Sequence, residues 1–348
     1  MAKNSGADLQ RILLTTLALA LVGVLGLLLW ALIDVLFMLF LGVLLAIALR
    51  FAAGQVQRFT PIPHPWSLGV VLVIGLGVVV LSLVLLVPAV AGQFGDLVEQ
   101  VEIAIVLLQD FLTSGPWSDH LPPDAINDLN DTTNLPNIQN TLNQLTGAAA
   151  EGFGILANLL FILFTALFLA VDTQRYRASL VQLVPIQGRP RARQVIDQVI
   201  HGLKMWLLGR VVSMVLIAIV ITIGLQLMGV PLALALGVLT GLFEFIPVVG
   251  PLLSAVPAIL MGFTVGPMMA LYVAVFYLIV QQLEGNVLTP IVQMKTADLP
   301  PVLTLTAVVA MGILFGPLGV LVATPLALVG MLLVQELYIH DVLERQPQ

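Results

Sequence analysis

Two acidic residues stand out because they lie within long apolar stretches of the chain. Glu244 is three residues before Pro247, and Glu284 ends an apolar stretch and is followed by Gly285 and Asn286. On insertion scales, a charged side chain in the middle of a bilayer costs about 2.5–3.5 kcal/mol, so such residues usually mark a pathway or a binding site. We predict that Glu244 and Glu284 bind a cation or a proton and that Asn286 is a neutral polar contact. Either acid could instead lie among the lipid headgroups without such a role.

Other side-chain chemistry is poorly represented. The chain has no cysteine, and its four histidines (His64, His120, His201 and His340) lie outside the apolar stretches without metal-ligand spacing. No His-Glu-x-x-His sequence, phosphate-binding Gly-x-x-x-x-Gly-Lys sequence or serine with a placed base occurs. We therefore expect no enzymatic activity, no bound metal and no cofactor.

Composition then defines the surroundings of these residues. Of the 348 residues, 59% are apolar and 9% are charged, whereas soluble domains have about 25% charged residues. This composition excludes an ordinary cytosolic enzyme, a disordered tail and a nucleic-acid-binding module. The lipid bilayer is the expected partner.

Six apolar stretches predict full crossings, because about 20 apolar helical residues cover a hydrocarbon layer of roughly 30 Å. They lie at 12–32, 33–49, 68–90, 152–171, 211–228 and 268–283. The first three form an N-terminal unit over 1–90, and the fourth stands alone at 152–171. The last two belong to a C-terminal transmembrane core at 211–334.

The placement of lysine and arginine predicts the orientation, because basic residues collect on the cytoplasmic side. Lys3 and Arg11 precede the first crossing, and seven basic residues follow the fourth between 175 and 210. The stretch 59–174 has no basic residue. We predict an acidic extracytoplasmic helical insertion at 91–151 and a basic amphipathic cytoplasmic segment at 172–210 that turns into the fifth span. The tail at 335–348 and both termini are predicted to be cytoplasmic.

Two apolar stretches in the C-terminal core are interrupted by proline and glycine. The stretch 230–264 contains Pro247, Gly250 and Pro251, and 301–334 contains Gly316, Pro317 and Gly319. Proline ends or bends a helix, so each stretch predicts two short arms joined at a tip. Re-entrant hairpins that line a polar path are one interpretation, and ordinary spanning hairpins are the other. Both interpretations leave the C-terminus on the same side of the membrane, so the positions of the charged residues do not distinguish them.

Small residues and one further proline complete the predicted path. Gly237 and Gly241 lie four residues apart before the first tip, as Gly312 and Gly316 do at the second. Such spacing allows helices to approach closely, so Gly237, Gly241 and Gly312 are predicted to pack helices together. Pro290 follows Asn286 and is assigned to the path with the prolines and glycines of the tips.

Several motifs together resemble one protein family. They are Gly229-Val230-Pro231, Phe243 through Pro251, Gln281-Gln282-Leu283-Glu284-Gly285-Asn286, Leu299-Pro300-Pro301, Phe315 through Gly319 and Ala323-Thr324-Pro325. With Trp206 through Arg210 and Phe168 through Asp172, they are similar to the autoinducer-2 exporter family, also called PerM permease-like proteins. The resemblance covers nearly the whole chain and is strongest from Gly229 onward.

The resemblance implies a multi-pass protein of the bacterial inner membrane with eight segments. It also implies a homo-oligomer, for which a pentamer is one form. Some members of that family are described as exporters of autoinducer-2 and others as sodium/proton antiporters. At position 244, where the chain has glutamate, many relatives are expected to have a neutral residue.

Together these observations predict an all-α polytopic membrane protein with six full crossings, two broken hairpins and an extracytoplasmic insertion. The predicted function is transport of a small polar solute. A cation/proton antiporter is the alternative within transport, and a non-transporting oligomeric scaffold is the alternative of another class.

Overall fold

The computed structural model describes part of the chain. The described residues are 14–17, 20–21, 23–24, 26–28, 30–59, 67, 69–73, 103, 106–107, 152–247, 249–288 and 299–343. A third of the predicted span at 12–32, most of the predicted span at 68–90 and nearly all of the predicted insertion at 91–151 lie outside these residues. Pro290 and the last five residues of the predicted tail lie outside them as well.

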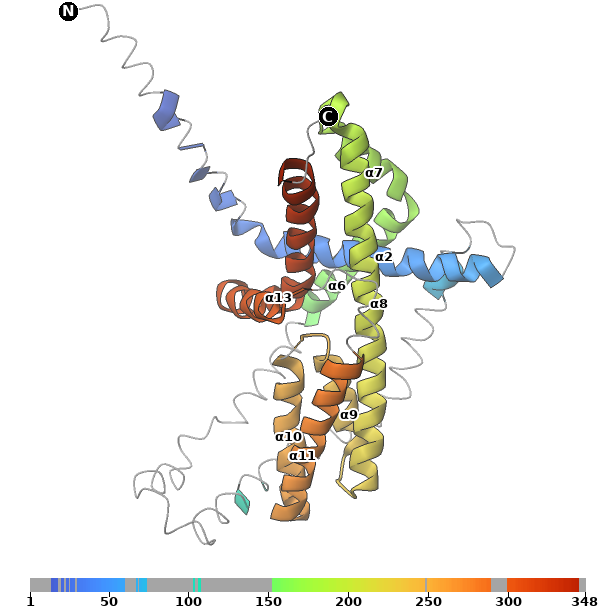
Figure 1. The fold of residues 1–348 in the computed structure, drawn as a ribbon, viewed down its shortest axis with the longest axis vertical. Helices are drawn as coiled ribbons and strands as arrows, with labels where there is room; N and C mark the ends of the chain where they lie inside the picture. Colours follow the sequence, from blue (N-terminus) through green and yellow to red (C-terminus); the bar gives the residue numbers. More distant parts are fainter. Residues whose placement is uncertain are drawn as a thin grey trace, which may run out of the picture.

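Every regular element in the described ranges is helical, which confirms the all-helical class (Figure 1). The longer helices are α2 (Ile33–Phe59), α6 (Gly152–Val171), α7 (Thr173–Gln182), α8 (Arg189–Leu227), α9 (Ala233–Phe243), α10 (Val249–Val265), α11 (Pro267–Leu283) and α13 (Pro301–Val334). The shorter helical turns are η2 (Ile186–Gly188), η3 (Glu284–Leu288) and η4 (Gln335–Leu343).

Four of the described helical segments are long and apolar enough to cross a membrane. They are Ile33–Arg58, Ile186–Leu227, Pro267–Asn286 and Pro301–Leu343. The pair α6 and α7, bent by 85°, becomes a fifth if it is counted as one span. Large apolar side chains on these helices face outward, for example Ile313 and Leu278, as a lipid-facing surface requires. The described residues thus give a multi-pass helical membrane protein and leave the count of eight segments a prediction.

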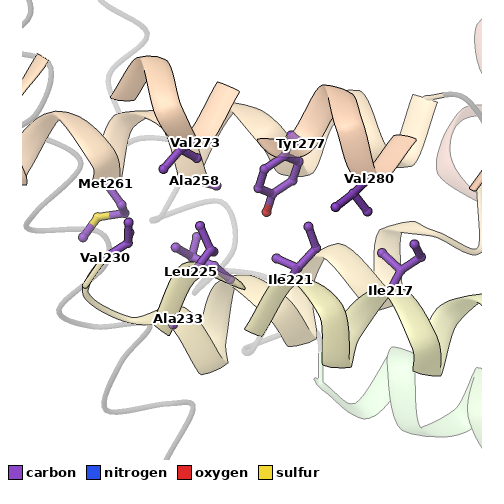
Figure 2. Close-up of a cluster of buried hydrophobic side chains, with 11 residues drawn as sticks. Ile217, Ile221, Leu225, Val230, Ala233, Ala258, Met261, Val273, Tyr277 and Val280 are labelled. Atoms are coloured by element: carbon purple, nitrogen blue, oxygen red, sulfur yellow. The ribbon is translucent and has the colours of Figure 1, made fainter. Parts of the chain in front are cut away.

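The largest buried apolar cluster among the described residues lies in a bundle of the C-terminal half of α8 with α9, α10 and α11 (Figure 1). Its core contains Ile221 and Leu225 of α8, Met261 of α10, and Val273 and Tyr277 of α11 (Figure 2). Leu225, Met261 and Val273 are fully buried. The stretch predicted as the first broken hairpin therefore has two separate arms, α9 and α10, both held in this bundle.

Helix α8 differs from the prediction that the basic segment turns before the fifth span. It is one helix of 39 residues, about 58 Å long at about 1.5 Å per residue. Pro190 stands in its first turn, where proline is tolerated, and the next proline is Pro231. The helix has no proline between them to break it, so the basic half continues into the apolar half without a turn.

Helix α13 is two helical arms that meet at Gly316. Gly316 has φ 64° and ψ −152°, a backbone conformation that is essentially restricted to glycine. The tip predicted at 315–319 is therefore a bend at one residue, and Pro317 already belongs to the second arm. The arms are in contact beside the bend, because a Cβ atom on Gly312 would lie 2.9 Å from Val320 Cγ2. The second arm packs against α8 and α2 through Leu328 and Leu332.

Ion pairs join the first turns of α8 to neighbouring elements. Arg191 of α8 is paired with two acids of η4, Glu336 at 2.9 Å and Asp341 at 3.0 Å. Arg177 of α7 is paired with Asp197 of α8. The chain segment that follows α13 is therefore attached to the start of α8.

Candidate functional site

Three ionisable side chains meet where α9 ends, α11 ends and α8 passes both. Arg210 Nη1 of α8 lies 3.3 Å from Glu244 Oε1 and 3.8 Å from Glu284 Oε1. Side-chain exposure is 11% for Arg210, 1% for Glu244 and 8% for Glu284. We call Arg210, Glu244 and Glu284 the polar cluster. Glu244 and Glu284, predicted from sequence as two separate candidates, share one buried site.

Close packing of α9 against α8 brings Glu244 to Arg210. A Cβ atom on Gly241 would lie 2.6 Å from Ala218 Cβ and 2.8 Å from the Met214 carbonyl oxygen. A Cβ atom on Gly237 would collide with Thr222. Glycine at both positions lets the two helix backbones approach, and α9 ends one residue before Glu244.

The described residues of the tip between α9 and α10 are 244–247, and their backbone is also held by Arg210. Arg210 Nε donates a hydrogen bond of 3.2 Å to the carbonyl oxygen of Phe245. The Phe245 ring makes an edge contact with Trp206 at 5.8 Å between centroids. Gly250 lies so close to the Phe243 carbonyl that any side chain there would collide with it. Gly250 and Pro251 are in the first turn of α10 rather than in the tip.

Helix α11 positions the second carboxylate. Gln281 Nε2 donates a hydrogen bond of 2.5 Å to Glu284 Oε2. One turn before Glu244, the buried Thr240 hydroxyl is hydrogen-bonded to the Tyr277 hydroxyl at 2.8 Å, so α9 and α11 are also joined by a polar contact. These bonds orient Glu284 and join α9, the helix that leads to Glu244, to α11.

The cluster has hydrogen-bonding capacity that the described protein does not use. Arg210 Nη2 and both carboxylate oxygens of Glu244 are buried and make no hydrogen bond within the described part of the chain. Two carboxylates also face a single guanidinium. Buried charges require counter-charges or hydrogen bonds, because removing them from water costs several kcal/mol each. The arrangement therefore has room for a proton, a cation or a polar solute.

The other predicted site residues lie elsewhere or outside the described residues. Asn286 is exposed and donates a hydrogen bond of 2.9 Å to the Gln282 carbonyl oxygen in its own helical segment. Gly316 is the bend of α13, Pro317 and Gly319 lie in the arm that follows it, and Phe315 before the bend contacts Trp30 and Phe37. Within the described structure they contribute no hydrogen bond or ion pair to the cluster. No group of three metal-ligating side chains occurs among the residues described.

Arg210 is the member that the sequence interpretation assigned only to the basic cytoplasmic segment. A basic residue directly before an apolar span is the usual orientation signal. The signal that could have identified it is the apolar sequence on both sides, Trp206-Leu207-Leu208-Gly209 before it and Val211-Val212 after it.

A multi-pass helical protein with a broken hairpin and an ionisable cluster at the hairpin tip has the architecture of membrane transport proteins. Comparison with known proteins gives the family. The chain belongs to the AI-2E family transporters, because the model of that family matches residues 17–339. The resemblance seen in the sequence motifs is therefore confirmed.

Several relatives are known by name. "Putative transport protein YueF" of Bacillus subtilis is 26% identical over 298 residues, which cover 82% of this chain and 81% of the relative. "Putative transport protein YhhT" of Escherichia coli K12 is 24% identical over 312 residues, 84% of this chain and 82% of the relative. "AI-2 transport protein TqsA" of the same bacterium is 25% identical over 197 residues, 56% of each chain.

Proposed function

We propose that this transporter moves a small polar solute of the autoinducer-2 type out of the bacterial cell, with the polar cluster as the binding centre. The observation that supports this most directly is the burial of Arg210, Glu244 and Glu284 together at the tip of an interrupted hairpin. The unused guanidinium nitrogen and carboxylate oxygens offer one donor group and two acceptors to a solute. The relative TqsA, by its name, transports autoinducer-2.

The length of α9 supports a re-entrant first hairpin. Helix α9 has 11 residues and is about 16 Å long, which is roughly half of the ~30 Å hydrocarbon layer. The carboxyl end of α9 and the amino end of α10 both face the tip, where helix ends carry partial charges. In this proposal Pro247, Gly250 and Pro251 shape the tip around the solute.

Asn286, Pro290, Gly316, Pro317 and Gly319 are proposed to line the route away from the cluster, and Gly312 to hold the bend of α13 together. The proposal includes a homo-oligomer, with a pentamer as one form, in the bacterial inner membrane. The distribution of basic residues supports a cytoplasmic location for both termini.

A second candidate function is exchange of a monovalent cation for a proton. It is favoured by one feature of the cluster, the presence of two carboxylates beside one guanidinium. The carboxylate without a counter-charge would bind sodium or a proton in turn.

Transport in liposomes tests both candidates. In protein reconstituted into vesicles, Glu244→Gln and Glu284→Gln should each lower the flux of autoinducer-2 at least tenfold, whereas Asp34→Asn, an exposed acid of α2, should leave it unchanged. If sodium-driven proton movement is lost instead, the exchanger is supported. Normal flux in the double variant would remove the carboxylates from the mechanism. Wild-type protein that moves neither solute would support the scaffold alternative.

Access of water to the tip can be measured separately, because the chain has no cysteine. A cysteine at Ile246 should react with a membrane-impermeant maleimide, whereas a cysteine at Leu225 in the bundle core should not. The same reaction at a cysteine that replaces Leu318, next to Pro317, tests the bend of α13. Failure of both sites to react from either side would contradict a polar route there.

A further inference from the structure

A second feature of the structure is an open cavity of about 430 Å³ where α2 crosses α8. Its walls are residues of α2 between Leu41 and Phe51, residues of α8 between Lys204 and Val211, and Phe245 of the hairpin tip. Lys204 is the one charged residue in the lining, and all other lining residues are apolar. The volume is in the range of small-molecule sites, about 300–1,000 Å³. We call this cavity the α2–α8 groove.

The groove lies where the character of α8 changes. From Arg189 to Arg210 the helix has five basic residues, and from Val211 to Leu227 it has no charged residue. Such a change from basic to apolar marks the boundary between headgroups and hydrocarbon. The α8 part of the lining therefore reaches this boundary, with Lys204 on its basic side and Val211 at the start of its apolar side.

Lys204 is arranged to receive an anion. Its Nζ lies over the Phe51 ring, 4.6 Å from the centroid. Within the described residues no carboxylate lies within ion-pairing distance of this ammonium group. An ammonium group has three donors, and a ring face offers it no hydrogen-bond acceptor oxygen. A phosphate above an apolar chain complements this arrangement, as in basic sites between membrane helices that bind anionic lipids.

We infer that the α2–α8 groove binds one anionic phospholipid, with an acyl chain against its apolar walls and the phosphate on Lys204. The inference goes beyond the proposed function and does not depend on the solute transported. Because Phe245 lines the groove and its carbonyl accepts the hydrogen bond from Arg210, the bound acyl chain touches the hairpin tip.

Native mass spectrometry of the purified protein tests the inference. Phosphatidylglycerol adducts should exceed adducts of phosphatidylcholine with the same acyl chains at least fivefold. Lys204→Gln should abolish this excess, and Lys204→Arg should keep it. The matched control is Arg193→Gln, which removes an exposed charge from the same helix and should have no effect. Ala48→Trp, which fills the groove, should reduce the binding of both lipids.

Fluorescence gives an independent measurement that does not require a groove-filling variant. Trp206 contacts Phe245, so in a variant whose other three tryptophans are phenylalanine it reports on the groove. Phosphatidylglycerol with brominated acyl chains should quench Trp206 more strongly than brominated phosphatidylcholine, and Lys204→Gln should remove the difference.

Two results would overturn the inference. One is that phosphatidylglycerol forms as many adducts with Lys204→Gln as with wild type and quenches Trp206 equally in both. The other is a lipid-free oligomer in which a cysteine at Ala48 is protected from maleimide, which would show that a second copy of the chain fills the groove. Neither result would change the flux and tip-labelling outcomes that test the proposed function.

Discussion

At the scale of single residues, Arg210 has a different role from either acid. It is the one cation that the described structure places in the polar cluster, and it also holds the tip backbone at Phe245. Removing one carboxylate leaves a guanidinium with another partner. Removing the guanidinium leaves two buried carboxylates facing each other, which is the more costly change.

Replacing Arg210 should therefore destabilise the protein strongly. We expect Arg210→Gln to lower the free energy of unfolding by about 3–5 kcal/mol, the usual cost of leaving a buried charge unpaired. Thermal unfolding in detergent measures this. Arg193→Gln is the control and should change stability by no more than about 0.5 kcal/mol.

The double variant Arg210→Gln/Glu244→Gln should recover part of the stability lost in Arg210→Gln. Recovery is expected because one buried negative charge is removed along with the positive one. A double variant less stable than Arg210→Gln alone would contradict the ion-pair account of the site.

Sequence reasoning could find the acids of the site but not the cation. Glu244 and Glu284 were identifiable because a charge is rare in an apolar stretch. Arg210 looked like an orientation signal, since its partners are 34 and 74 positions away and no local pattern contains them. Asn286 has the right chemistry, but the structure leaves it exposed and bonded to Gln282, which spacing along the chain could not show.

At the scale of elements, the position of the hairpin depends on close packing between α8 and α9. Gly241 faces Ala218 and the Met214 carbonyl at distances that leave no room for a larger side chain. The pair of helices therefore sets how far Glu244 lies from Arg210. Overpacking at this contact moves the tip as well as straining the bundle.

Gly241→Leu should both destabilise the protein and impair the site. Overpacking of a tight contact costs about 1–3 kcal/mol, measured as a lower unfolding temperature, and autoinducer-2 flux should fall as well. Gly330→Ala in α13 is the control, because a Cβ atom there has no neighbour within 4 Å. Alanine favours a helix over glycine by up to about 1 kcal/mol, so the control should be neutral or stabilising.

The bend of α13 gives a second prediction for an element. Gly316→Ala should cost about 1–3 kcal/mol, because alanine is strained at the backbone angles of Gly316. Comparison of its unfolding temperature with that of Gly330→Ala separates the strain from the general effect of a methyl group. Equal unfolding temperatures for the two variants would show that the backbone angles of Gly316 contribute nothing to stability.

Element boundaries were predictable where the apolar pattern is unbroken. Helix α6 covers the predicted stretch 152–171, and α11 begins one residue before the predicted stretch 268–283. The interrupted regions were less predictable. Proline and glycine indicated a break near Gly316, but only the backbone angles show that it occupies one residue. The absence of proline between Pro190 and Pro231 could have predicted the continuity of α8, yet the change in charge suggested a turn.

At the scale of the whole molecule, the described parts are joined by long-range contacts near both ends of α8. The bundle of α9, α10 and α11 packs on its C-terminal half, and η4 is attached to its first turns. The membrane setting followed from composition, and the multi-pass helical class followed from the long apolar stretches. Which helices are neighbours did not, because lipid-facing and protein-facing apolar residues look alike in sequence.

Release of η4 from α8 should expose the C-terminal segment. We expect Arg191→Gln to increase protease cleavage within residues 335–343 several-fold, because Glu336 and Asp341 lose their shared partner. Cleavage is followed by mass spectrometry of the detergent-purified protein. Arg193→Gln serves as control, and equal cleavage in both variants would show that the segment is held by other contacts.

The unbroken length of α8 has a mechanical consequence. A helix is stiff along its axis, so a displacement of its first turns is passed on to every later residue. Arg191 and Arg210 are on this same rigid rod, 19 residues or about 28 Å apart. A displacement of the C-terminal segment is therefore passed along α8 from Arg191 to the guanidinium that holds the hairpin tip.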